Sequence, residues 1–213
     1  MERFVSRIDM DKTAALYNTR FDEFGRDIKT VGWGNEADQR LRFDVLFRGL
    51  DPKGKTILDV GCGLAGLIPY LEEKTNNDFQ YIGIDIAEKL IEDAQKQYSK
   101  PGRSFFTGDI FSVDLPVIDI AVLSGALSFK TENIEAYAYE TMSKMFSLCK
   151  EAACLNFMSK YADFEAEKNQ HYQPETVFAK AKELSKMVNL LHDYPLYEFT
   201  VQLFKKNPTK LLK

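Results

Sequence analysis

The sequence is poor in the residues that mark disulfide frameworks and metal centres. Its 213 residues include three cysteines and two histidines. The cysteines form no C-x-x-C pair and stand in apolar or glycine-rich surroundings, which predicts reduced thiols in a cytoplasmic protein. The histidines have no clustered ligand residues beside them, so the sequence predicts no metal site.

Long apolar runs and a surplus of positive charge are missing as well. No run approaches the ~20 apolar residues that a membrane-spanning helix needs, and the first five residues lack the apolar core of a signal peptide. The formal net charge is -4 and the pI is about 5.4, so there is no basic surplus of the kind that holds nucleic acid. We therefore expect a cytoplasmic protein that binds neither membranes nor nucleic acids.

The length suits one domain with its own hydrophobic core. From residue 55 onward apolar strands and amphipathic helices alternate, which predicts a parallel sheet with helices on both faces. Two final strands are joined so closely that they must be antiparallel. The expected strands are 56–60, 80–85, 104–107, 118–123, 152–157, 188–193 and 198–204. The expected helices are 11–27, 35–50, 64–74, 87–98, 134–149 and 175–187, and the aromatic and methionine stripe of 134–149 is expected in the core.

The residues with the clearest chemistry follow the first strand of this pattern. Residues 56–66 read TILDVGCGLAG, a strand, a glycine turn and the start of a helix. Gly61 and Gly63 tolerate positive φ and let a nucleotide approach the backbone. The next strand ends in Asp85, whose carboxylate can accept hydrogen bonds from both hydroxyls of a ribose. The arrangement predicts a nucleoside site at the carboxyl ends of the strands.

The segment LDVGCG at 58–63 resembles motif I of the class I S-adenosylmethionine (SAM) dependent methyltransferases, in which an acid such as Asp59 ends the first strand. A carboxylate there suits a cationic ligand and repels a pyrophosphate. The terminal hairpin also resembles that family, in which strand seven inserts antiparallel between strands five and six. The resemblance covers residues 31–206. It implies SAM as cofactor and a Rossmann-like, seven-stranded, mostly parallel sheet with an antiparallel strand seven and helices on both faces.

The resemblance also implies which residues contact the cofactor. Asp109 would bond the adenine amino group, unless it is only a turn residue, and Ile110 would flank the ring. Arg42 would pair with the carboxylate of SAM, unless it is a solvated helix arginine, and Trp33 belongs either to a cover or to plain packing. Residues 1–50 are expected to form a helical cover, 51–206 the methyltransferase core and 207–213 a frayed tail. The expected cofactor contacts are Tyr17, Trp33, Arg42, Asp59, Gly61, Cys62, Gly63, Asp85, Ile86, Asp109, Ile110, Ser124 and Gly125.

The sequence says less about the residues that would bind the methyl acceptor. The long connection 161–174 holds His171 and Tyr172, and an imidazole titrates near neutrality, so His171 is the candidate base unless it only packs against Tyr172. The residues expected to contact the acceptor are Lys130, Asn156, Asp193 and Tyr194, at predicted strand ends. The loop after the fourth strand lacks the Asn/Asp-Pro-Pro-aromatic tetrad of the adenine-N6 and glutamine methyltransferases, which excludes that substrate class.

Three functions remain. The first is methyl transfer to a small polar acceptor with a hydroxyl or phosphate-type oxygen. The Gly-Trp and Asp-Tyr pairs near the two ends resemble enzymes of surface-glycan or natural-product pathways, so we expect a glycan precursor or a natural-product intermediate. A nucleotide-dependent oxidoreductase is the second, and Asp59 and the terminal hairpin oppose it. A SAM-binding module without catalysis is the third. We expect a monomer or a homodimer.

Overall fold

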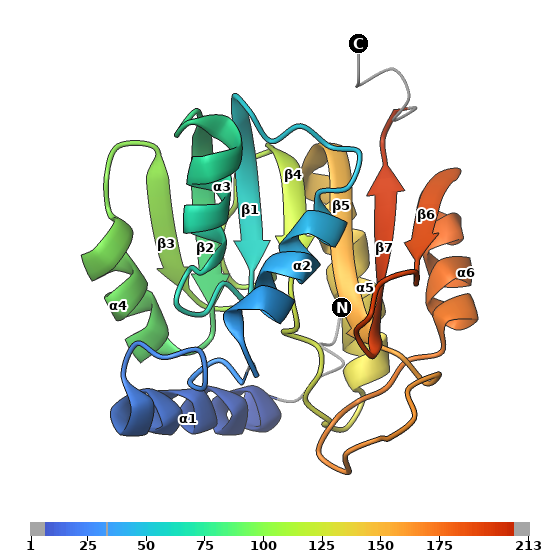
Figure 1. The fold of residues 1–213 in the computed structure, drawn as a ribbon, viewed down its shortest axis with the longest axis horizontal. Helices are drawn as coiled ribbons and strands as arrows, with labels where there is room; N and C mark the ends of the chain where they lie inside the picture. The colour runs from blue at the N-terminus through green and yellow to red at the C-terminus, as the bar shows by residue number, and fades with distance from the viewer. Residues whose placement is uncertain (1–6, 33, 207–213) are drawn as a thin grey trace.

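The computed structural model describes residues 7–32 and 34–206 (Figure 1). A seven-stranded sheet of order β3-β2-β1-β4-β5-β7-β6 runs through the molecule. The first five strands are parallel, and β7 lies antiparallel between β5 and β6. The strands are β1 (Lys55–Val60), β2 (Phe79–Asp85), β3 (Arg103–Thr107), β4 (Ile118–Leu123), β5 (Cys149–Met158), β6 (Met187–Leu191) and β7 (Glu198–Phe204). The fold class predicted from the sequence is confirmed.

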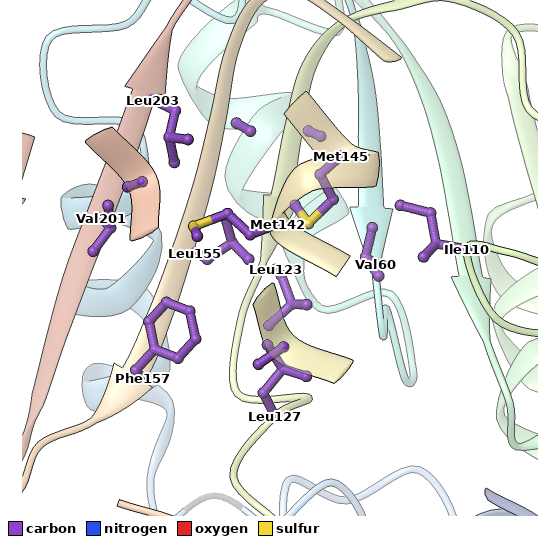
Figure 2. Close-up of a cluster of buried hydrophobic side chains, with 14 of the residues drawn as sticks. Val60, Ile110, Leu123, Leu127, Met142, Met145, Leu155, Phe157, Val201 and Leu203 are labelled. Atoms are coloured by element: carbon purple, nitrogen blue, oxygen red, sulfur yellow. The ribbon is translucent and has the colours of Figure 1, made fainter. Parts of the chain in front are cut away.

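Helices cover both faces of this sheet. They are α1 (Arg7–Phe24), α2 (Glu36–Leu46), α3 (Leu67–Thr75), α4 (Glu88–Tyr98), α5 (Ile134–Leu148) and α6 (Pro174–Leu184). Successive strand residues point to opposite faces, so Ile57 packs in the core with α2, α3 and α4 while Leu58 packs in the core with α5 and α6. Figure 2 shows Met142 and Met145 of α5 in the second core, as the sequence predicts.

The N-terminal segment crosses the ends of the parallel strands and rests on α4. In Figure 1 α1 lies at the edge to which β1 and β2 point. Arg26 stacks on the ring of Tyr98, 4.9 Å from the ring centroid, and pairs with Asp93. Lys89 of α4 pairs with Asp22 of α1 at 2.5 Å. These contacts place α1 over the carboxyl edge of the sheet.

Some predictions from the sequence fall outside this description. Trp33 and the tail 207–213 lie outside the described residues. The proposed division at residue 50 stays a prediction. Within 7–32 and 34–206, no helix is long and apolar enough to cross a membrane.

Candidate active site

A cavity of about 560 Å³ opens at the carboxyl ends of the parallel strands. Asp59 and the glycine turn after β1 form one part of its wall, and Asp85 at the end of β2 forms another. The loop after β4 contributes Ser124, and α1 contributes Tyr17. Ligands of open α/β sheets bind at this edge, so the cavity is the candidate active site.

The glycine turn is tight because other parts of the chain press against it. Gly61 has a φ of 71°, and a Cβ there would lie 2.3 Å from the Cβ of Ala126 in the loop after β4. Gly63 has a φ of 53°, and a Cβ there would lie 2.8 Å from Cγ1 of Val31. Both glycines are therefore required by the closeness of the cavity walls as well as by their backbone conformation.

Asp85 fixes the turn and faces the cavity. Its Oδ2 accepts a hydrogen bond from the Gly63 N–H at 2.9 Å, and its Oδ1 accepts one from the Ala87 N–H at 2.9 Å. Burial raises the pKa of Asp85, and these backbone donors oppose the rise. Each carboxylate oxygen has two lone pairs, so both oxygens retain capacity for a ligand hydroxyl.

Asp59 lies beneath the turn, with 4% of its surface exposed. Its Oδ2 accepts a hydrogen bond from the Tyr81 hydroxyl at 2.7 Å. Loss of solvation raises the pKa of Asp59 to about 7, the Tyr81 hydrogen bond opposes the rise, and the negative charge of Asp85 adds to it. A cationic ligand would favour ionisation of this carboxyl group.

Asp109 and Ile110 form the wall after β3. The Asp109 Oδ1 accepts hydrogen bonds from the backbone N–H groups of Phe111 and Ser112, at 2.9 and 2.7 Å. Asp109 therefore shapes a turn and also borders the cavity, so both readings of the sequence describe part of its environment. Its contact with an adenine ring stays a prediction.

The charges around the cavity are mostly negative. Six carboxylate side chains and two arginines line it, and no lysine or histidine does so among the described residues. Arg40 is held by Glu73 at 2.6 Å, and Arg26 is held by Asp93. An arrangement of this sign favours a cation over an anion.

Most of the residues predicted to contact the cofactor come together here. Those that line the cavity are Tyr17, Asp59, Gly61, Cys62, Gly63, Asp85, Ile86, Asp109, Ile110, Ser124 and Gly125. The positions of these residues fit the prediction, and their contact with a cofactor stays a prediction.

Arg42 is an exception and corrects the prediction from the sequence. Its guanidinium is buried and contacts both carboxylate oxygens of Glu198, with Nε at 2.7 and 2.9 Å and Nη2 at 2.7 Å. Arg42 does not line the cavity. Its carboxylate partner in the structure belongs to β7 and not to a ligand.

Asn156 acts behind the cavity wall. Its Oδ1 accepts a hydrogen bond from the Gly125 N–H at 2.7 Å, and its Nδ2 donates to Oε2 of Glu198 at 2.9 Å. Asn156 is buried in β5 and does not line the cavity. The predicted direct contact with the acceptor is thus replaced by support for the loop after β4.

His171 and Tyr172 also lie away from the cavity. They are 2% and 1% exposed. The Nδ1 of His171 lies 2.8 Å from the Ser159 carbonyl oxygen, and the Tyr172 hydroxyl donates to the Leu127 carbonyl at 2.9 Å. A β-bridge between Ser159 and Tyr172 folds the connection back beside β5 and turns these side chains inward. The structure therefore does not place a histidine base at the cavity.

The three other predicted acceptor contacts lie at separate places away from the cavity. Lys130 is exposed, and its backbone N–H is bonded to the Lys168 carbonyl. Asp193 is exposed and pairs with Arg48. The hydroxyl of buried Tyr194 lies 3.0 Å from the Thr200 hydroxyl. None of Lys130, Asp193 and Tyr194 lines the cavity, although Phe129 and Thr131 beside Lys130 do.

The sequence analysis missed one wall of the cavity. Ile134, Tyr137 and Thr141 of α5 line it. Their spacing of three and four residues puts them on one helical face. The sequence analysis assigns the aromatic and methionine stripe of this helix, which includes Tyr137, to the core and gives Thr141 no role.

Comparison with known proteins shows which family the chain belongs to. The profile of the family described as "Methyltransferase domain" matches residues 51–204. Rv1506c of Mycobacterium tuberculosis, provisionally named a methyltransferase, is 27% identical over 157 residues, which are 70% of this chain and 93% of that protein.

Solved structures show the same fold. Magnesium protoporphyrin IX methyltransferase from Synechocystis PCC 6803, with bound SAH, is 15% identical with a TM-score of 0.65, covering 93% of this chain and 99% of that one. The DhpI–SAH complex is 12% identical with a TM-score of 0.65, covering 93% and 97%. The family profile spans most of the chain, and the chain therefore belongs to the methyltransferase domain family, as the motif at 58–63 predicts.

Proposed function

We propose that the chain is a SAM-dependent methyltransferase that acts on a small polar acceptor. The observation that carries the proposal is the position of Asp85, whose carboxylate lies at the cavity and is fixed by the N–H of Gly63 in the glycine turn. The surplus of carboxylates suits a ligand with a sulfonium and an ammonium group. The cavity also has the volume of a ligand site. The two structures compared above are similar in fold and contain SAH.

The described residues support catalysis by alignment. When bound, SAM would supply a methyl group on a sulfonium, and an acceptor atom would bond to the methyl carbon in line as the carbon–sulfur bond breaks and SAH leaves. The chain would hold the ribose at Asp85 and the positive groups near Asp59, and fixing both reactants removes much of the entropic barrier. Because Lys130 and His171 do not line the cavity, the phosphate-type acceptor and the histidine base lose their support, and a hydroxyl acceptor is retained.

The wider setting remains our expectation. We propose a glycan precursor or a natural-product intermediate as acceptor, and a cytoplasmic monomer or homodimer. The competing oxidoreductase function would need a pyrophosphate near Asp59, which the charges around the cavity oppose.

Calorimetric titration tests the proposal. SAM and SAH should each bind one site per chain, and NAD should give no heat of binding. Tight NAD binding without measurable SAM binding would reject the proposed function. Release of SAH in the presence of acceptor then separates an enzyme from a binding module.

The pKa of Asp59 predicts how SAM affinity changes with pH. Its folded-state pKa is raised to about 7, so below that pH a proton must leave before the carboxylate can face a cation. SAM affinity should therefore rise from pH 6 to pH 8, by about tenfold from this group if contact requires ionisation. Tyr81 and Cys62 beside it have pKa values raised above their ordinary ones, so they stay neutral in this range.

Asp59→Asn is the matched variant for this measurement. SAM and Asp85 titrate in the same way in the wild type and in Asp59→Asn. Their effects therefore cancel in the ratio of the two dissociation constants for SAM. That ratio should change about tenfold between pH 6 and pH 8. Parallel profiles for the wild type and Asp59→Asn would show that this carboxyl group does not respond to the cofactor.

A second prediction concerns α1 and α2 as a cover. Thr13, Tyr17 and Gln39 line the cavity from these helices, so a bound cofactor should add contacts that oppose their local opening. Amide hydrogen exchange in α1 and α2 should slow when SAH is added. α6 contributes no residue to the cavity and serves as the internal control. Equal exchange with and without SAH in α1 and α2 would contradict the cover.

A further inference from the structure

The loop after β4, residues 124–131, is paired with a segment that lies far along the chain. That segment is 168–172, here the clamp segment, in the connection between β5 and α6 (Figure 1). An antiparallel bridge joins Phe129 to Asn169, and a backbone hydrogen bond on either side of the bridge extends the pairing. Residues of this loop line the cavity, so the clamp segment supports one of the cavity walls.

Tyr172 adds a side-chain contact between the clamp segment and the loop. Its hydroxyl donates to the Leu127 carbonyl at 2.9 Å, and Leu127 lines the cavity. Burial raises the pKa of Tyr172, so the hydroxyl keeps its proton and remains a donor. The two residues are 1% and 2% exposed. Loss of the hydroxyl would therefore take a hydrogen bond from a buried carbonyl, which costs more than loss of an exposed bond.

Tyr172 is itself fixed to the end of β5. Its N–H donates to the Met158 carbonyl at 2.8 Å, and its own carbonyl accepts from the Lys160 N–H at 3.0 Å. Its ring meets the ring of Phe157 edge-on, with the centroids 5.0 Å apart. Because backbone and ring are both held, the hydroxyl has a set position. Tyr172 thus ties the loop after β4 to the carboxyl end of β5.

The sheet order indicates which part of SAM this loop would face. Four neighbouring strands follow in the order β3, β2, β1 and β4. The residue proposed to contact adenine, Asp109, follows β3, and the residue proposed to hold the ribose, Asp85, ends β2. In SAM the sulfonium is attached beyond the ribose. A ligand extended along this edge of the sheet would therefore have its sulfonium and amino acid portions beside β1 and the loop after β4.

We propose that Tyr172 is a positioning residue, which holds the loop after β4 against the sulfonium and amino acid portions of SAM through its bond to the Leu127 carbonyl. This inference rests on the proposed function and adds to it a residue that does not touch the cofactor. Without the bond, the loop would leave its position more often. SAM would then bind only the fraction of molecules with the loop in place, and its apparent dissociation constant would rise accordingly.

The first test measures cofactor affinity in Tyr172→Phe, which loses the hydroxyl and keeps the ring. In calorimetric titration, SAM and SAH should each bind about three- to tenfold more weakly than to the wild type, the factor for one neutral hydrogen bond. Thr75→Val is the matched control. Thr75 is equally buried, its hydroxyl donates to the Leu71 carbonyl at 2.7 Å, and it does not line the cavity. Both variants should have a lower Tm, but Thr75→Val should bind SAM as the wild type does.

The outcomes separate this inference from the proposed function. A folded Tyr172→Phe protein with wild-type dissociation constants for SAM and SAH would overturn the positioning role alone. Equal weakening in Tyr172→Phe and Thr75→Val would also overturn it, because a general loss of stability would then explain the effect. A wild-type chain that binds neither SAM nor SAH would reject the proposed function, and this inference with it.

Adenosine shows where along the ligand the effect arises. It contains the adenine and the ribose but has neither the sulfur nor the amino acid portion, so its proposed contacts are Asp109 and Asp85. Its dissociation constant, measured by competition with SAH, should be the same in the wild type and in Tyr172→Phe. A loss of affinity for adenosine equal to the loss for SAH would overturn the assignment to the sulfonium end.

Amide hydrogen exchange tests the hold on the loop with no ligand present. In Tyr172→Phe the amides of residues 125–130 should exchange about three- to tenfold faster than in the wild type, because one bond fewer opposes local opening. Thr75→Val should leave exchange in this loop unchanged. Wild-type exchange rates at 125–130 in Tyr172→Phe would show that the backbone pairing with the clamp segment holds the loop by itself, and the proposal would fall.

Discussion

Asp85→Ala is expected to weaken SAM binding by about 10- to 100-fold. The variant loses the carboxylate that we propose accepts hydrogen bonds from the ribose, and one hydrogen bond to a charged group contributes ~1.5–3 kcal/mol. It also leaves the N–H groups of Gly63 and Ala87 without their present acceptor. Both effects should raise the dissociation constants of SAM and SAH together, because the two share the ribose.

Two further variants separate these effects. Asp85→Asn keeps the shape of the side chain and one oxygen that can accept from a backbone N–H, so its loss of affinity reports mainly on the charge. Asp119→Ala removes a carboxylate at the opposite end of β4, where it accepts from the Thr56 N–H at 2.9 Å. Asp119 does not line the cavity, so its removal should leave SAM affinity unchanged. An Asp85→Ala protein that is folded and binds SAM at wild-type strength would place the ribose elsewhere.

The sequence was sufficient where a short segment determines its own structure. Strands 118–123 and 198–204 have the predicted bounds. The first is a mainly apolar segment, and in the second polar and apolar residues alternate. Asp59 and Asp85 line the cavity because motif and strand end lie within the same βαβ unit. Helix α1 spans Arg7–Phe24, so it includes residues before the expected start at 11 and ends before the expected end at 27.

The sequence was insufficient where a partner lies far along the chain. Arg42 and Glu198 are 156 positions apart, and no local pattern pairs them. His171 was predicted to face the acceptor because an imidazole can act as a base near neutral pH. The β-bridge at Tyr172 turns its side chain away from the cavity. The structure supplies the reason for the pair: Glu198 begins a seven-residue strand that is buried throughout, and a charged residue there requires a partner.

Replacement of Glu198 is expected to have the largest effect on stability. The Arg42–Glu198 pair is buried, with side chains 9% and 8% exposed, and removal of one partner leaves the other charge uncompensated. Glu198→Leu should therefore lower the free energy of unfolding by about 3–5 kcal/mol, as measured by urea denaturation. Arg40 lies two residues before Arg42 in α2, and Arg40→Met removes its exposed pair with Glu73. This variant should change the free energy of unfolding little.

The double variant Arg42→Met/Glu198→Leu distinguishes an uncompensated charge from a packing defect. If burial of one unpaired charge is the cost, removing both charges should restore most of the lost stability. The restoration should stay incomplete, because Asn156 donates to Glu198 and holds the Gly125 N–H behind the cavity wall. Glu198→Leu and the double variant should therefore both bind SAM less tightly than the wild type. A double variant no more stable than Glu198→Leu would show that the loss comes from packing, and the ion pair would then have no special role.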